Sequence, residues 1–453
     1  MKIIALSLLA LVSSLFFGST VSKVPPYQKI EADHRLLWKA NVGMASFRSN
    51  LYADQSMLLI GSNGSAFRDW NFVDSKSGLY YISPIDGHII NSVSHQKWGD
   101  FDVNGVLVYN RQVFYGNDNE EFMCVDMKGR VIWKIVVSGD VEAEPILLDI
   151  RGRKVIVYAT ELGEVKAVDP KNGRAIWSYF TPDFNGWREG DSRPIFKVKA
   201  FLSSTESFYT KPIVSDVNGD GVGDVIYVGY NDVVYCINGA TGRLIWSLTD
   251  SSVEFGLNID SRVVSGQPEF WLTSSIYNEK KENCNLEIVR INKSGVIIGK
   301  IPLQESRYFS FSLNSFALNK EQQLYATEDS LFLIESQKVK KKLYLGDSYK
   351  YKNPWDEVEQ VGNRTSSDQL FGSRVFKYVN HDSCIALLSQ IDAANNDTGF
   401  ITIVSLSNFQ IVGKYSLPSM AEMPPQILDI NGDGALELLV NCLDGNLYCY
   451  QLK

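Results

Sequence analysis

Hydrophobic positions along this chain occur in short runs that alternate with polar positions, a pattern that predicts β-strands. The alternating runs DVIYVGY, VVYCIN and RLIWSL follow an apolar run that ends in Asp, and a turn containing Gly precedes the last of them. Four such runs in series predict a four-stranded antiparallel meander. No stretch of comparable length shows helical periodicity.

The same unit recurs along the chain. Residues 216–238 align with residues 429–451 without a gap, a third copy starts at Asp149, and a fourth, partial copy covers residues 122–133. Fixed-unit similarity of this kind marks a repeat architecture in which each unit packs on its neighbours. The predicted third strands begin near residues 79, 121, 163, 232, 286, 330, 400 and 446, which gives eight units.

The two ends of the chain complement each other. The last unit stops at Lys453 directly after its third strand, while residues 34–39 near the N-terminus look like an isolated fourth strand. Pairing of these ends would leave no open edge in the ring. We therefore predict an all-β fold: a single eight-bladed β-propeller of four-stranded antiparallel blades over residues 23–453, in which the N-terminal strand completes the last blade.

Two repeat signatures resemble known families. DxNGDGxxD/E is similar to FG-GAP-type propeller repeats, and VxAVDxxxGRxIW is similar to quinoprotein-like (PQQ-like) repeats, including those of periplasmic outer-membrane assembly scaffolds. The resemblance extends over essentially all of the predicted mature chain and implies the propeller fold. It does not by itself imply one activity, because proteins with these repeats have unrelated functions.

The N-terminus and the charge bear on location and partners. Lys2, an apolar run over residues 3–17 and the small residues Thr20 and Ser22 predict a signal peptide over residues 1–22. No later apolar run could span a membrane, so we expect a soluble, monomeric protein that is secreted or periplasmic. With 44 Lys and Arg against 52 Asp and Glu, the net charge is −8, which argues against nucleic acid as a partner.

Two Asp-rich loops predict calcium binding. Oxygen ligands alternate along each loop, and glycines permit the tight turn that points them inward, as calcium requires. The predicted ligands of the two Ca²⁺ sites are Asp216, Asn218, Asp220, the Val222 carbonyl and Asp224 in the first loop, and Asp429, Asn431, Asp433, the Ala435 carbonyl and Glu437 in the second. The alternative is an Asx-rich turn without an ion. In the third copy arginines replace two ligands, and Arg151 or Arg153 could pair with Asp149 instead.

Catalytic residues are not evident in the sequence. The resemblance to quinoproteins implies an adjacent Cys-Cys pair against the cofactor, which this chain lacks, so we do not expect pyrroloquinoline quinone (PQQ) to bind. Cys124, Cys236 and Cys449 share one repeat position and should be buried free thiols. Cys442 and Cys449 lie on neighbouring predicted strands and could form a disulfide. The repeated Trp133, Trp177 and Trp246 are predicted to dock one blade on the next.

Insertions into the short repeat all fall between strands two and three of a blade or between blades, at residues 61–78, 181–211, 277–285, 346–370 and 391–398. Both kinds of connection emerge on one face of a propeller, here called the long-loop face; the other is the short-turn face. Long loops on one face of a repeat array usually build a binding surface. The candidate ligand-binding residues there are Arg68, Trp70, Trp187, Arg188, Arg193 and Trp355. The alternative is that these aromatic residues only anchor their loops.

The sequence therefore favours an exported, non-catalytic propeller that binds a protein or carbohydrate partner through its long-loop face. One alternative is an enzyme on the same fold, either a divergent quinone-dependent dehydrogenase or a polysaccharide lyase. A third possibility, an adhesion module, rests only on the resemblance to FG-GAP repeats.

Overall fold

The computed structural model describes residues 28–65, 76–94, 101–182, 184, 208, 210–229, 231–250, 254–278, 283–306, 315–319, 321–327, 330–345, 370–371, 375–393 and 396–452. The predicted signal peptide lies outside these residues. Regular structure in the described part is almost entirely β, with one short 3-10 helix, η1 (Ile30–Ala32).

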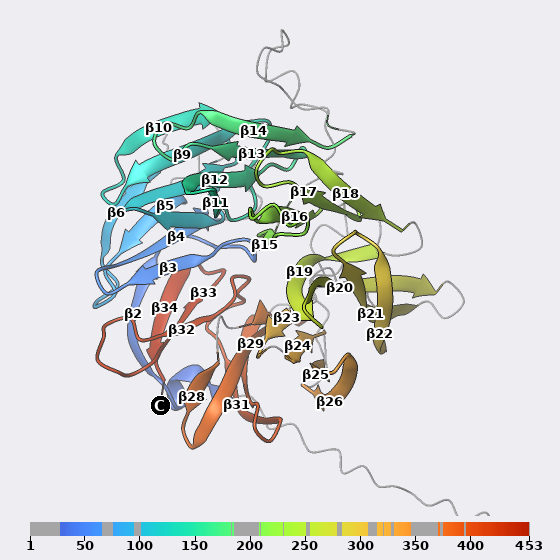
Figure 1. Cartoon of the computed structure of the whole chain (residues 1–453). Helices are drawn as coiled ribbons and strands as arrows, with labels where there is room; N and C mark the ends of the chain where they lie inside the picture. Colours follow the sequence, from blue (N-terminus) through green and yellow to red (C-terminus); the bar gives the residue numbers. More distant parts are fainter. Residues whose placement is uncertain are drawn as a thin grey trace, which may run out of the picture.

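Eight β-sheets, arranged as blades, follow one another around a ring (Figure 1). Blades 1 to 4 are four-stranded and antiparallel, as predicted. Their strands are β3 (Leu51–Asp54), β4 (Met57–Asn63), β5 (Ser77–Ile82) and β6 (Ile89–Val93); β7 (Val106–Tyr109), β8 (Gln112–Asn117), β9 (Glu121–Asp126) and β10 (Val131–Val136); β11 (Ile146–Ile150), β12 (Arg153–Ala159), β13 (Glu164–Val168) and β14 (Ala175–Phe180); and β15 (Ile213–Ser215), β16 (Asp224–Val228), β17 (Val233–Ile237) and β18 (Leu244–Thr249).

Blades 5 and 6 continue the pattern, and in blade 7 two short segments, β27 and β28, occupy the place of a first strand. The strands are β19 (Glu254–Val264), β20 (Gln267–Asn278), β21 (Asn283–Asn292) and β22 (Ile297–Ser306); β23 (Ser315–Ala317), β24 (Gln322–Ala326), β25 (Ser330–Glu335) and β26 (Lys338–Tyr344); and β27 (Leu370–Phe371), β28 (Phe376–Tyr378), β29 (His381–Ala393), β30 (Asn396–Ser405) and β31 (Gln410–Ser416). Third strands begin at or within four residues of the predicted positions in all eight blades.

The ring closes where the sequence predicted. Blade 8 contains β32 (Gln426–Leu428), β33 (Glu437–Asn441) and β34 (Asn446–Gln451), and β2 (Arg35–Asn41) from the N-terminus pairs antiparallel with β34. In Figure 1 the blue β2 accordingly lies beside the red β34. A second contact was not predicted: β1 (Gln28–Lys29) pairs in parallel with β31 and adds an outer strand to blade 7. The N-terminal segment therefore pairs with two consecutive blades.

The core lies between neighbouring blades. In one cluster Phe114 and Phe122 of blade 2 pack with Ile156 and Tyr158 of blade 3, and the rings of Phe122 and Tyr158 stack with centroids 4.2 Å apart. Each fully buried side chain of this size stabilises the fold by about 1.5–3 kcal/mol. Since every blade buries both of its faces, no blade has a complete core of its own.

Docking tryptophans reinforce four of the junctions between blades, and the predicted packing role is confirmed. Each lies on the fourth strand of one blade, and its indole Nε1 donates a hydrogen bond to a backbone carbonyl in a turn of the next blade. A glycine with positive φ in that turn lies against the ring, and a Cβ there would come within 2.6–2.8 Å of an indole carbon. The bonds are Trp38 to Pro84 (3.0 Å), Trp133 to Pro170 (3.0 Å), Trp177 to Gly239 (2.9 Å) and Trp246 to Lys293 (2.9 Å).

Two predicted insertions have a different form from the expected loops. Residues 277–285 and 391–398 were expected to be loops, but most of them extend strands: β20 runs to Asn278 and β21 starts at Asn283, while β29 runs to Ala393 and β30 starts at Asn396. The antiparallel pairing continues to the end of both hairpins. The repeat pattern could not show this, because longer strands and longer loops both appear as extra residues.

Candidate functional site

The first Asp-rich loop connects β15 to β16 on the short-turn face. The Asp216 carboxylate accepts hydrogen bonds from the backbone amides of Gly219 (2.7 Å) and Gly221 (3.0 Å). Asp224 is fully buried and accepts from the amides of Val217 (3.0 Å) and Gly239 (3.2 Å), and its burial raises its pKa. The backbone amides of the loop thus already satisfy much of its negative charge.

Side chains link the remaining residues of this loop. Asn238 donates from its amide nitrogen to Asp220 (3.1 Å) and to Asp224 (3.2 Å), and the bond to Asp220 lowers the pKa of that carboxyl. Asn218 donates to Asp224 as well (3.3 Å). The sequence reasoning did not find Asn238, which lies outside the loop and approaches it from the end of β17.

The second loop connects β32 to β33 and repeats this geometry. Asp429 accepts from the amides of Gly432 (2.6 Å) and Gly434 (3.0 Å). Glu437 is fully buried, and its Oε2 accepts from the Ile430 amide (3.0 Å), but its Oε1 is buried without a hydrogen-bond partner. Burial raises the pKa of Glu437. A buried carboxylate oxygen without a partner is costly, and a cation would satisfy it.

The donor chemistry of the second loop therefore fits a hard cation better than that of the first. No group of three or more His, Cys, Asp or Glu side chains in the described residues is arranged to hold a metal ion. To bind calcium, the carboxylates of either loop would have to give up hydrogen bonds from backbone amides and coordinate the ion instead. Calcium binding at both loops remains a prediction.

In the third copy of the loop, the ion pairs differ from those expected. Asp149 forms an ion pair with Lys154 (2.7 Å), and Arg153 pairs with Asp169 (2.9 Å). The hypothesis that Arg151 or Arg153 pairs with Asp149 is thus wrong, because Lys154 reaches Asp149 from directly across the β11–β12 pair.

Chain length is distributed very unevenly between the two faces. On the short-turn face the longest connections between described strands are the Asp-rich loops, 216–223 and 429–436. On the long-loop face the connections 181–212 and 345–369 are far longer. The predicted binding residues Arg68, Trp70, Trp187, Arg188, Arg193 and Trp355 all lie outside the described residues, so the structure does not bring them together or separate them.

The described part of the long-loop face carries a polar cluster that the sequence reasoning missed. Arg48, between β2 and β3, forms an ion pair with the buried Glu142, between β10 and β11. Asn104, between β6 and β7, donates to Glu142 (2.6 Å) and accepts from the Ser46 hydroxyl (2.9 Å). Connections from three successive inter-blade positions therefore meet through polar side chains.

Further acids surround Arg48. Burial raises the pKa of Asp118 well above its usual range, and the neighbouring Glu142 raises it further while Arg48 lowers it. Burial also raises the pKa of Glu422 to about 7, against an opposing effect of Arg48. These residues come from connections outside the repeat, and no spacing rule links them. No sequence pattern could therefore have revealed this cluster.

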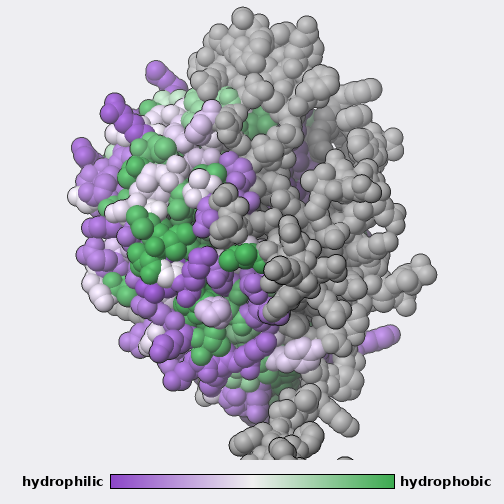
Figure 2. All heavy atoms as spheres, turned by 90° about the vertical axis from the view of Figure 1, so that its right-hand side faces the viewer, coloured by the Kyte–Doolittle hydropathy of each residue, from purple (hydrophilic) through white to green (hydrophobic). Residues whose placement is uncertain are grey.

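The described surface that faces the viewer in Figure 2 has no single large apolar patch. In Figure 2 the hydrophobic residues of the described surface (green) form several small areas separated by hydrophilic ones (purple). Isolated apolar residues are normal on soluble proteins.

The cysteine prediction is confirmed for Cys124, Cys236 and Cys449, which are buried and free. The possible Cys442–Cys449 disulfide is wrong, because both are free as well. Burial raises the pKa of the Cys124 thiol to about 12 and that of Cys384 to about 11. Neither has the lowered pKa of a nucleophilic cysteine.

A family model described as outer membrane protein assembly factor BamB matches residues 31–193 and 162–255. Over these residues the chain is a β-propeller with PQQ-like repeats. The resemblance to PQQ-like repeats inferred from the sequence is thus confirmed over the matched region, which extends from η1 into the beginning of β19. No curated protein matches the sequence.

Solved structures with the same fold cover most of this propeller. The Dos1 propeller has a TM-score of 0.57 at 11% identity and covers 92% of this chain and 95% of its own. Sqt1 from Saccharomyces cerevisiae has a TM-score of 0.56 at 8% identity, with 93% and 99% covered. Quinohemoprotein alcohol dehydrogenase ADHIIG from Pseudomonas putida HK5 has 0.51 at 11%, with 94% and 78% covered. At these identities the similarity shows the fold alone.

No helix in the described residues is long and apolar enough to cross a membrane.

Proposed function

We propose that this PQQ-like propeller is an exported, non-catalytic scaffold that binds a protein or carbohydrate partner through its long-loop face. It would act in the periplasm or after secretion. The observation that carries the proposal is the one-sided distribution of chain length, with connections 181–212 and 345–369 on the long-loop face. Loops displayed by a rigid ring are the usual site of recognition.

One finding favours a protein partner over a carbohydrate. The BamB family model concerns an assembly factor, and its match covers the blades from which several of the long-loop connections emerge.

Site-specific photo-crosslinking tests the proposal. A photoreactive amino acid replaces Trp187 on a long-loop connection or, as a matched control, Val263, which lies at the end of β19 near the short-turn face and is 69% exposed. The expected result is a discrete crosslinked product from position 187 and none from position 263 in the compartment where the protein acts. A product from position 263 alone would refute the use of the long-loop face.

The alternative that the protein is an enzyme can be tested separately. The long-wavelength absorbance of PQQ should be unchanged when the purified protein and calcium are added, and uronic-acid polymers should not be cleaved. A saturable change in the absorbance, or cleavage of the polymers, would contradict the non-catalytic part of the proposal whatever the crosslinking result.

Calcium at the two Asp-rich loops is the second part of the proposal. The unpartnered Oε1 of Glu437 supports the second site, and the repeated ligand pattern supports the first. Both loops lie on the short-turn face, so the ions would stabilise blades 4 and 8 rather than contact the partner. Two ions per chain are expected by calorimetric titration, and one after Glu437→Ala.

A further inference from the structure

The junction between blades 6 and 7 departs from the docking pattern of the regular blades. In a regular blade the docking residue follows the bulge of the fourth strand: Trp246 lies opposite Cys236, one step after the register shift. In blade 6 the same position, opposite Leu333 and next to the same kind of shift, is occupied by Lys341. A lysine thus replaces the indole.

The receiving turn of blade 7 has changed in parallel. Gly295 lies under the Trp246 ring with a φ of +77°, and the corresponding residue in the turn between β30 and β31 is Phe409, which keeps a positive φ of +56°. The Lys341 ammonium lies 5.6 Å from the centroid of the Phe409 ring, a cation–π contact. Leu406 occupies the position of Lys293, whose carbonyl accepts the indole bond of Trp246, because each is the second residue after matching third-strand positions, Val404 and Ile291.

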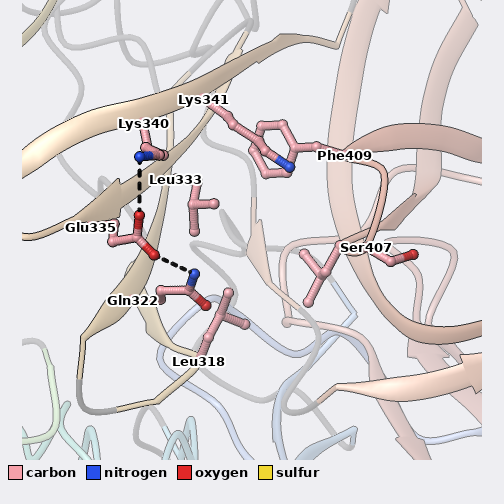
Figure 3. Close-up of a pocket in the computed structure, with 9 residues that line it drawn as sticks. Leu318, Gln322, Leu333, Glu335, Lys340, Lys341, Ser407 and Phe409 are labelled. Atoms are coloured by element: carbon pink, nitrogen blue, oxygen red, sulfur yellow. Dashed lines mark hydrogen bonds and ion pairs between the residues drawn. The ribbon is translucent and has the colours of Figure 1, made fainter.

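These exchanges leave a pocket at the junction. Its volume is about 270 Å³, slightly below the roughly 300–1,000 Å³ of sites that hold a whole small ligand, so it suits a single large side chain. Leu318, Leu333, Leu406 and Phe409 supply apolar lining, and Ser407 lies at its edge. Figure 3 shows Lys341 beside the Phe409 ring, with Leu333 and Leu318 nearby.

The rim of the pocket is positively charged in a protein whose net charge is −8. Lys340 and Lys341 of the exposed strand β26 line the pocket, and Lys338 is the first residue of the same strand. Glu335 is the acidic residue among the lining side chains; it accepts from Gln322 (2.8 Å) and lies 3.5 Å from Lys340 (Figure 3). Two lining ammonium groups against one lining carboxylate leave a local positive excess, which complements an acidic ligand.

We propose that this junction binds an acidic peptide segment of a partner protein by inserting one aromatic side chain, best a tryptophan, where a docking tryptophan of the ring is missing. The ring of the peptide residue packs on Leu333 and Phe409. If it is an indole, its N–H reaches the Leu406 carbonyl, as Trp246 reaches that of Lys293. Acidic residues on either side of the aromatic residue pair with Lys338 and Lys340. The site lies on the short-turn face and is independent of the proposed long-loop site.

The probe for this site is a fluorescein-labelled peptide, Asp-Glu-Trp-Glu-Asp, whose binding to the full-length protein is followed by fluorescence anisotropy. Two control peptides replace its Trp by Ala or its acids by Lys. We expect saturable binding of the probe, at least tenfold weaker binding of either control, and weaker binding as salt rises from 50 to 300 mM. Equal affinity for the Trp and Ala peptides would overturn the proposal.

Protein variants locate the binding. Lys341→Trp restores the docking residue of the regular blades and should abolish peptide binding. The double variant Lys341→Trp/Phe409→Gly recreates the whole docking pair and should also abolish binding. It keeps the test decisive if the single variant packs badly against Phe409. The matched control is Lys342→Ala. Lys342 is the next residue of β26 but bonds to Gln304 of blade 5 (2.8 Å), so this variant should bind normally. Unchanged binding by the double variant, or equal loss in the control, would refute the site.

Discussion

The docking contact of Trp177 provides a quantitative test of how the blades are held together. Gly242 lies under this ring with a φ of +70°, and a Cβ at this position would come 2.6 Å from Cε3 and 2.8 Å from Cδ2 of the indole. Trp177 is only 7% exposed and is fixed at its other edge by the bond to Gly239, so it cannot easily move aside. Gly242→Ala should therefore be costly.

Two separate effects contribute to that cost. Positive φ destabilises an alanine by about 1–2 kcal/mol, and overpacking against the indole adds about 1–3 kcal/mol. Gly152, in the turn between β11 and β12, has a φ of +89°, but no atom lies within 4 Å of the place that its Cβ would take. Gly152→Ala should therefore lose only about 1–2 kcal/mol. Any effect of alanine on the unfolded chain is common to both variants and cancels in the comparison.

Urea unfolding followed by circular dichroism measures both variants. The same pair is then made in a Trp177→Ala background, where Gly242→Ala should cost no more than Gly152→Ala, which corresponds to a coupling of about 1–3 kcal/mol between Gly242 and Trp177. Equal costs for the two glycines in the native background, or a cost at Gly242 that does not change when the indole is removed, would refute the docking argument.

Three further outcomes are expected. Calcium at ten to a hundred times its dissociation constant should add about 1.4–2.7 kcal/mol per site, seen as a higher melting temperature than in magnesium, and Glu437→Ala should remove about half of the gain; no shift with calcium would contradict both sites. Because burial raises the pKa of Glu422 from 4.5 to about 7, the folded protein holds this proton more tightly than the unfolded chain, so stability should fall as pH rises between these values. Glu422→Gln should remove up to about 3 kcal/mol of that fall between pH 5 and 8, measured by urea unfolding; an unchanged pH dependence would contradict it. The six buried cysteines should react with a thiol reagent only after denaturation, and a thiol that reacts rapidly in the native protein would contradict their burial.

Positions that repeat were predictable from the sequence because the same physical demand recurs in each blade. Trp177 and Trp246 follow Gly-Arg pairs in matching segments, and each meets a turn glycine of the next blade. Closure by β2 was predictable for the same reason, since an isolated fourth strand needs a third strand to pair with. The spacing of hydrophobic residues was therefore sufficient to predict the topology.

Positions outside the repeat were not predictable. Arg48 and Glu142 belong to connections that resemble no other segment, and only the ring brings them together. The unpartnered Oε1 of Glu437 likewise depends on packing, because its counterpart Asp224 has the same place in the loop but gains Asn238 as a donor. A pattern reveals which residue types share a place, and it does not reveal which atoms remain unsatisfied.

The regular and irregular blades divide the ring into two parts. The family match ends at residue 255, at the start of blade 5, and the docking tryptophans lie in blades 8, 2, 3 and 4. In blade 1 the docking position holds Asn91, whose side-chain amide donates to the Lys128 carbonyl of blade 2 (2.7 Å). In blades 5 and 7 this position holds Gly299 and Gly413, and in blade 6 it holds Lys341. The longest hairpins, β20–β21 and β29–β30, are in blades 5 and 7.

Because each blade packs only on its two neighbours, a change at one junction affects the stability of the others little. Blades 5 to 7 could therefore lose the docking pair and acquire new surfaces while the remaining junctions kept the ring closed. The pocket at Lys341 lies within this divergent part. At the four tryptophan junctions an indole and a glycine fill the corresponding place, so the lysine and phenylalanine of this pocket are consistent with the proposed peptide site.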